Sequence, residues 1–103
     1  FLFDLDGVLW LGDEPIPGAA EAINLLKERG KQIIFVTNNS TKSREQYAEK
    51  LNKLGINEVE EDVIVSAGMA TAVYKNKLKK HYPGKKVYVI GEEGLVDELE
   101  NVG

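Results

Sequence analysis

Strand-like and helix-like segments alternate along this chain of 103 residues, and that alternation restricts its fold more than any other feature. Short runs rich in β-branched and aromatic residues lie at 1–4, 31–36, 63–66 and 86–90. Longer segments with apolar residues at helical spacing lie between them. This order is typical of βαβ units, so the sequence predicts an α/β fold with a mostly parallel sheet and flanking helices.

The predicted helices have recognisable ends. Pro17 opens a helix of about a dozen residues, and Gly30 suits the position just after it. Ser43 and Gln46 form a capping-box pattern for a second helix, which we expect to stop at Gly55. A helix between consecutive strands is what a parallel sheet requires, so these signals agree with the predicted fold.

Other segments carry more specific expectations. Residues 31–36 are apolar in succession, which is typical of a strand buried on both faces. Residues 8–16 predict a bend or a small hairpin. A third helix is expected over about 67–80, with Val73 and Tyr74 among its inward residues, and a last helix follows the strand predicted at 86–90.

Charge and residue counts exclude several classes of protein. The 13 basic and 17 acidic residues give a net charge of −4, which argues against general nucleic-acid binding. No apolar run approaches the roughly 20 residues needed to cross a bilayer. Cysteine is absent and histidine occurs once, so disulfides, thiolate metal sites and histidine-based sites are disfavoured. We therefore expect a cytoplasmic protein with no membrane or nucleic-acid partner.

Two carboxylates end the first predicted strand. Asp4 and Asp6 are two residues apart, so an extended chain presents both on one face. Their mutual repulsion is relieved by a cation between them or by a proton on one of them. The structural alternative is a β-hairpin with Asp6 and Gly7 in its turn.

The second predicted strand ends in small polar residues at 37–41. If the first two strands are parallel neighbours, both clusters lie at one sheet edge, where open parallel sheets bind ligands. Hydroxyl, amide and backbone N–H groups suit an anion, and the carboxylates suit a hard cation. That combination fits a phosphate bridged by Mg²⁺, with a carboxylate as the nucleophile. A simple capping loop at 37–41 is the alternative.

Two motifs carry a family resemblance. Residues 4–10, Asp-Leu-Asp-Gly-Val-Leu-Trp, resemble motif I of the haloacid dehalogenase (HAD) superfamily. Residues 36–40, Val-Thr-Asn-Asn-Ser, resemble its motif II in the form typical of the 4-nitrophenylphosphatase and phosphoglycolate phosphatase branch. Residues 39–44 and 89–95 are also similar to that branch. The resemblance implies a HAD-like Rossmannoid sheet and Mg²⁺-dependent hydrolysis of a small phosphorylated metabolite through an aspartyl-phosphate.

The resemblance also implies individual roles. Asp4 is expected to be the nucleophile and a Mg²⁺ ligand. Asp6 is expected to be the general acid and then the base for water, with its backbone carbonyl on the metal. A moving flap is expected at 7–16, including Trp10. The residues expected to contact the phosphate or the substrate are Thr37, Asn38, Asn39 and Gly7.

The family's third-motif lysine and fourth-motif acidic pair have no counterpart here, and both are expected after an inserted cap domain. We therefore expect an N-terminal fragment with little or no turnover, in which residues 1–82 belong to the catalytic core and 83–103 begin the cap. Phosphoglycolate, pyridoxal phosphate and aryl phosphates stay open as substrates, as does a homodimer of the full-length protein. A non-catalytic phosphate-binding, metal-binding or phospho-acceptor module is the alternative function.

Overall fold

A three-stranded parallel sheet forms the centre of the molecule. The computed structural model describes residues 1–103, with the strand order β1 (Leu2–Phe3), β4 (Ile34–Thr37) and β5 (Ile64–Ser66). Phe3 pairs with Phe35, so the first two strands are neighbours that run in the same direction. The predicted α/β fold with a parallel sheet is confirmed, and a tight hairpin of residues 1–11 is excluded.

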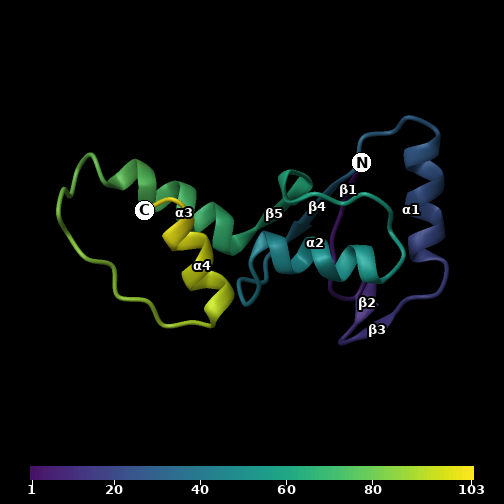
Figure 1. Cartoon of the computed structure of the whole chain (residues 1–103), viewed down its shortest axis with the longest axis horizontal. Coiled ribbons are helices and arrows are strands. Elements are labelled where there is room, and N and C mark those ends of the chain that lie inside the picture. The colour runs from purple at the N-terminus through teal and green to yellow at the C-terminus, as the bar shows by residue number, and fades with distance from the viewer.

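Two helices cover one face of this sheet. α1 (Ala19–Glu28) links β1 to β4, and α2 (Arg44–Lys53) links β4 to β5 (Figure 1). Because the strands are adjacent in chain order and such crossovers are right-handed, both helices lie on the same side. The predicted capping box of Ser43 and Gln46 is present at the start of α2.

A short hairpin separates β1 from α1. β2 (Trp10–Leu11) and β3 (Glu14–Pro15) pair antiparallel, with Trp10 opposite Pro15. This confirms the small hairpin expected at 8–16. Its first strand brings Trp10 into the core, where the side chain is completely buried.

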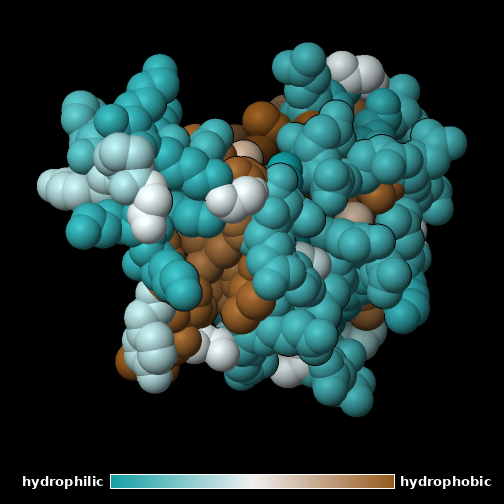
Figure 2. All heavy atoms as spheres, turned by 60° about the vertical axis from the view of Figure 1, so that its left-hand side comes forward, coloured by the Kyte–Doolittle hydropathy of each residue, from teal (hydrophilic) through white to brown (hydrophobic).

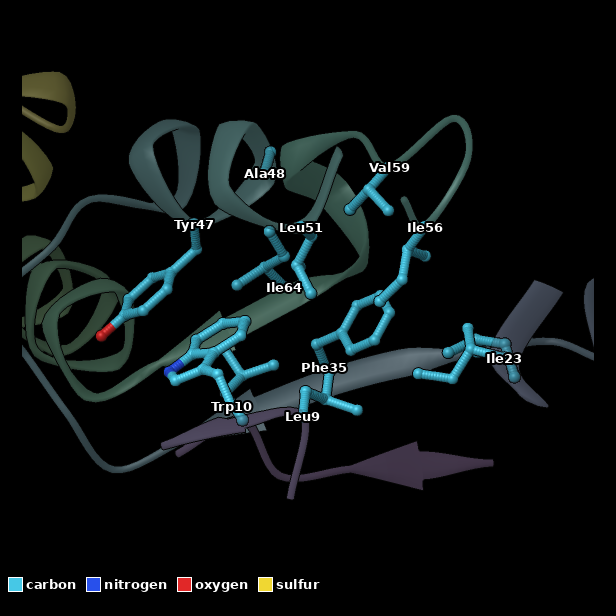
Figure 3. Packing of buried hydrophobic residues seen from close by; sticks show 12 residues of the cluster. Leu9, Trp10, Ile23, Phe35, Tyr47, Ala48, Leu51, Ile56, Val59 and Ile64 are labelled. Carbon is cyan, nitrogen blue, oxygen red and sulfur yellow. The ribbon is translucent and has the colours of Figure 1, made fainter. Parts of the chain in front are cut away.

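The core lies between the sheet and the two helices (Figure 3). Its side chains come from both helices, from the hairpin and from one face of the sheet. The buried residues of this cluster are Leu5, Leu9, Trp10, Ile23, Ile33, Phe35, Tyr47, Ala48, Leu51, Ile56, Val59 and Ile64. One continuous cluster therefore joins β1, β4, β5, α1 and α2 into a single unit.

The opposite face of the sheet is open. Phe35 is 1% exposed, whereas Ile34 and Val36 beside it in β4 are 39% and 37% exposed. The expectation that residues 31–36 are buried on both faces is therefore wrong for this chain. The physical reason is that α1 and α2 share one face, so side chains that alternate to the other face meet solvent. Leu2 and Val65 are exposed on the neighbouring strands.

The C-terminal third extends away from the sheet. A short 3₁₀ turn, η1 (Glu61–Val63), precedes β5, and β5 leads directly into α3 (Ala67–Leu78). α4 (Glu93–Asn101) packs against α3, and a wide arc joins the two helices (Figure 1). None of the helices is long and apolar enough to cross a membrane.

Two expectations for this third are wrong. Residues 86–90 are not a strand: Tyr88 is 90% exposed, because α3 carries the chain away from β5 and no strand lies beside the arc. Val73 and Tyr74 are exposed, and α3 turns its small residues Gly68 and Ala72 inward instead. α4 packs against this side of α3, where a Cβ on Gly68 would make an ordinary contact with Leu95 at 3.6 Å.

A buried ion pair fastens α4 to the start of α2. Glu98 is 2% exposed and accepts hydrogen bonds from the backbone N–H of Arg44 at 2.7 Å and from its Nε at 3.2 Å. Gly94 lies so close to the chain before α2 that a Cβ there would be 2.5 Å from the backbone of Lys42. The position therefore requires glycine, and α4 is held against the segment that follows β4.

The open sheet face generates a prediction. In the 103-residue chain, Val36→Thr with Val65→Thr should lower the fluorescence of the apolar probe ANS, because threonine keeps the β-branched shape while removing apolar surface. Far-UV circular dichroism should be unchanged. Leu25→Gln, at an exposed apolar position on α1, is the control. An equal fall in that control would show that the probe does not report the sheet face.

Candidate active site

Polar residues gather where the parallel strands end. Asp4 directly follows β1, Thr37 is the last residue of β4, and Ser66 is the last residue of β5. Thr37 and Ser66 are partners in the sheet, so these ends lie at one edge. The pairing of β1 with β4 brings the motif around Asp4 to the same edge, as the sequence predicted.

The turn after β1 directs both carboxylates outward. Leu5 is completely buried, while Asp4 and Asp6 on either side of it are exposed. One oxygen of Asp4, Oδ1, accepts the backbone N–H of Leu5 at 2.8 Å. Burial of the residue between them thus leaves both acids exposed at the end of β1, and a shared ligand for them stays a prediction.

Gly7 makes the reversal possible. Its φ is +82°, a left-handed conformation that favours glycine, and its N–H donates to the carbonyl of Trp10 at 2.7 Å. Because that amide is already bonded inside the turn, the contribution of Gly7 is to shape the loop. A direct contact between Gly7 and phosphate stays a prediction.

Asp6 is attached to the core through Trp10. The indole Nε1–H of Trp10 donates to Asp6 Oδ1 at 2.8 Å. The resemblance implied that Trp10 belongs to a flap at the site entrance, yet the side chain is completely buried among apolar residues. The indole ring therefore anchors the hairpin, and its polar edge faces the candidate site.

The loop after β4 is held by its own side chains. Thr37 is 4% exposed, and its Oγ1 accepts the N–H of Asn39 at 3.1 Å. Asn39 Oδ1 in turn accepts the N–H of Thr41 at 2.9 Å. In its hydrogen bond with Asn39 the Thr37 hydroxyl is the acceptor, so its hydrogen can be directed to another acceptor. Asn38 is exposed at the same edge.

Tyr47 is a polar residue of the site region that sequence reasoning missed, because its spacing on α2 marks it only as a core position. Its hydroxyl is buried and has no hydrogen-bond partner. Burial raises the pKa of Tyr47 above 10.0, and the nearby charge of Asp6 raises it further. Hydrogen bonding from the hydroxyls of Thr41 and Thr37 would stabilise the ionised phenolate, and this lowers the pKa in part. The phenol is therefore close to the carboxylate side of the candidate site.

The donors present suit a hard cation only in part. Asp4 and Asp6 offer carboxylate oxygens, the ligand type that Mg²⁺ prefers. The chain contains no group of three or more acidic, histidine or cysteine side chains placed to hold a metal ion. It therefore supplies two of the oxygen-bearing side chains that such a site needs.

A large cavity lies elsewhere. It is an open hollow of about 790 Å³ between α3, α4 and the arc that joins them, with Leu78, Val87, Val96 and Leu99 among its apolar walls. Figure 2 shows this apolar hollow framed by polar residues. Asp4, Asp6 and Thr37 are not among its lining residues, so it is separate from the candidate site.

Comparison with known proteins agrees with this geometry. The profile of the haloacid dehalogenase-like hydrolase family matches residues 1–103. The chain belongs to the haloacid dehalogenase-like hydrolases. The match covers both polar strand ends, and it confirms the family assigned from residues 4–10 and 36–40.

Two phosphatases are similar to the whole chain. A 4-nitrophenylphosphatase of Schizosaccharomyces pombe is 53% identical over 103 residues, which are 100% of this chain and 34% of that protein. Phosphoglycolate phosphatase 2 of Arabidopsis thaliana is 48% identical over 103 residues, with the same coverage of 100% and 34%. The chain thus spans about a third of the length of these relatives.

A solved structure of the family shows the same architecture. The p-nitrophenyl phosphatase of Archaeoglobus fulgidus superimposes with a TM-score of 0.82 at 45% identity, over 99% of this chain and 37% of that chain. The arrangement of parallel strands and helices described above is therefore similar to the matching part of that phosphatase.

The unpaired hydroxyl of Tyr47 generates a prediction. In the 103-residue chain, Tyr47→Phe should leave the free energy of unfolding near pH 7 unchanged or raise it by up to about 1 kcal/mol, because a buried polar group without a partner costs about 1–3 kcal/mol. Urea unfolding followed by circular dichroism measures this. Tyr82→Phe, at an exposed position, is the control and should have no effect.

The same pair of variants has a predicted pH dependence. The folded chain keeps the proton of Tyr47 more strongly than the unfolded chain, since its pKa is raised in the fold. Wild-type stability should therefore fall as pH rises above the unfolded value of about 10, and Tyr47→Phe should lack that part of the fall. An identical alkaline slope in both proteins would contradict the pKa shift.

Proposed function

We propose that the complete protein containing this chain is a Mg²⁺-dependent phosphatase that hydrolyses a small phosphorylated metabolite, of the phosphoglycolate or aryl-phosphate type. The observation that carries this proposal is the parallel pairing of β1 with β4. That pairing puts the acidic turn of Asp4 and Asp6 and the donor-rich loop of Thr37 at one sheet edge, where open parallel sheets bind ligands.

Each reacting residue has a role in two displacement steps. The carboxylate of Asp4 attacks phosphorus, and the P–O bond to the leaving group breaks as Asp6 gives that oxygen a proton. Water then attacks the aspartyl-phosphate while Asp6 takes its proton. Inorganic phosphate departs, and Asp4 and Asp6 return to their starting states.

The loop after β4 supplies the groups that bind the phosphoryl oxygens. The hydroxyl of Thr37 and the backbone N–H of the exposed residue Asn38 are donors of the type that binds such oxygens, and Asn39 lines the substrate side. The hydrogen bonds within the loop fix these groups before substrate arrives. Preorganised donors of this kind avoid the cost of reorientation during the reaction.

Mg²⁺ is the metal that this donor set fits. The side chain of Asp4 and the backbone carbonyl of Asp6 would hold it, together with oxygen ligands from the remainder of the complete protein. When bound, the ion would neutralise negative charge on the phosphoryl group and on the carboxylate of Asp4.

The names of the relatives support the reaction class. They include phosphatases of 4-nitrophenyl phosphate, of phosphoglycolate and, for a human protein 43% identical over 109 residues, of glycerol 3-phosphate. All three names denote hydrolysis of a phosphate monoester. The substrate of the complete protein, its cytoplasmic location, a homodimeric state and the division at residues 82 and 83 stay predictions.

Asp4→Asn in the complete protein should reduce the hydrolysis of 4-nitrophenyl phosphate to background. An amide cannot act as the nucleophile, and removal of the nucleophile abolishes the covalent route. The assay follows the release of 4-nitrophenol by the wild type and by the variant. Each protein is measured with added MgCl₂ and after treatment with EDTA, which tests the dependence of activity on the metal. Asp62→Asn, an exposed acid on η1, is the matched control and should keep wild-type activity.

Two outcomes would reject this function. Full activity in the Asp4→Asn protein would remove the aspartyl-phosphate route. A wild-type protein that accumulates phosphorylated Asp4 without releasing phosphate, detected by intact mass, would favour the phospho-acceptor alternative.

The isolated 103-residue chain should turn over 4-nitrophenyl phosphate slower than the complete protein by several powers of ten. It offers two carboxylates without a third metal-ligating side chain, and neither Asp4 nor Asp6 has a cationic partner. A single electrostatic group at such a site is typically worth about 10²–10³ in rate. Comparable rates per molecule in the two proteins would contradict this expectation.

A further inference from the structure

Asp6 differs from Asp4 in having a side-chain donor bonded to it. Asp4 Oδ1 is bonded only to the next backbone N–H, whereas Asp6 Oδ1 receives the indole N–H of Trp10 at 2.8 Å. An indole nitrogen can only donate a hydrogen bond, so the Asp6 oxygen that it contacts must act as the acceptor and does not carry the proton. The second oxygen of Asp6 has no protein hydrogen bond, so it is available for proton transfer.

Trp10 is itself fixed on several sides. It is completely buried, and the Nζ of Lys50 lies 4.3 Å from the centre of its ring. Lys50 also donates to the carbonyl of Gly12 at 2.9 Å and lies 3.6 Å from a carboxylate oxygen of Asp13. These contacts tie the β2–β3 hairpin to α2. The indole therefore cannot turn its N–H away from Asp6 without disrupting the core.

The polar atoms of the core are concentrated at this end. Among the side chains of the buried cluster, only Trp10 and Tyr47 carry a nitrogen or oxygen. Figure 3 shows the indole nitrogen and the phenol oxygen pointing to the same side of the cluster. The charge of Asp6 contributes to the raised pKa of Tyr47, which is consistent with a carboxylate beside both groups. A purely structural core would be served as well by apolar side chains at both positions.

We propose that Trp10 is the positioning residue of Asp6: its indole N–H holds one oxygen of the carboxylate, so that the other is directed to the oxygen of the leaving group. The inference rests on the proposed phosphatase function and deepens it. Lys50 maintains this arrangement by holding the hairpin on α2. The rigid core of the molecule thereby sets the orientation of the acid that protonates the leaving group.

Loss of a positioned general acid affects substrates differently according to their leaving groups, whereas general destabilisation of the fold does not. The proton from Asp6 matters most when the leaving group is an alkoxide, which is a strong base. It matters little for 4-nitrophenolate, which is stable as an anion. Loss of the Trp10 donor should therefore change the preference between two substrates, in addition to any change in overall activity.

The experiment compares kcat/KM for 4-nitrophenyl phosphate with kcat/KM for an alkyl phosphate, either phosphoglycolate or glycerol 3-phosphate, in the complete protein. For Trp10→Phe we expect a loss of about 10- to 100-fold on the alkyl phosphate, since positioned acids contribute about 10²–10⁴. On 4-nitrophenyl phosphate the loss should stay within about threefold, because little proton transfer is needed there.

Two further proteins separate positioning from packing. Replacement of Trp10 by β-(3-benzothienyl)alanine keeps the size of the ring and removes only the N–H, so it should reproduce the selective loss even if Trp10→Phe folds poorly. Leu51→Ala opens a cavity in the same cluster without touching Asp6. In the folded Leu51→Ala protein, both substrates should be affected by the same factor.

The outcomes are distinct. A selective loss on the alkyl phosphate in the benzothienyl protein, absent from Leu51→Ala, supports the inference. If the wild type is active, Asp4→Asn is inactive and the benzothienyl protein keeps the wild-type ratio, the positioning role is overturned while the phosphatase function stands. If the wild type hydrolyses none of these phosphates, the proposed function and this inference are both rejected.

Discussion

The pairing of β1 with β4 is the contact on which the rest of this molecule depends. Two residues of β1 are enough to set the register, because Leu2 and Phe3 pair with Ile34 and Phe35 of the longer strand. Parallel neighbours finish at a common edge, so one register places an acidic turn and a donor-rich loop together. The core reinforces this arrangement, since Leu5 and Phe35 belong to the same buried cluster.

Only one face of the sheet is buried, and this explains which strand residues are exposed and where the core ends. Both crossover helices lie on one face of the sheet, so the alternate residues of β4 and β5 are left exposed. The core is consequently a single layer, and it ends at the carboxyl edge of the sheet. At that end the buried side chains of Trp10 and Tyr47 carry polar atoms. Because the indole N–H of Trp10 is bonded to Asp6, the packing of the hairpin influences how the Asp6 carboxylate is oriented.

Local signals in the sequence were sufficient for most helix ends and for the polar residues that meet at one edge of the sheet. Gly30 has a positive φ just after α1, and Ser43 caps α2 as its pattern indicates. The strand predicted at 86–90 failed for a different reason. A strand is stabilised by its neighbour, and β propensity cannot tell whether a neighbour exists. Likewise, the spacing of Val73 and Tyr74 carries no information about which side of α3 receives α4.

The amino-acid order was enough to establish the α/β class, the family and the acidic and polar motifs at two strand ends, because periodicity, caps and short motifs are local properties. The contacts made by Trp10, Tyr47 and Glu98 could be known only from the folded chain. Each of these side chains meets a partner or an environment supplied by a different element, so its role depends on how helices and strands pack. A tryptophan four residues after an aspartate becomes its hydrogen-bond donor only when the turn at Gly7 folds the chain back and the core fixes the ring.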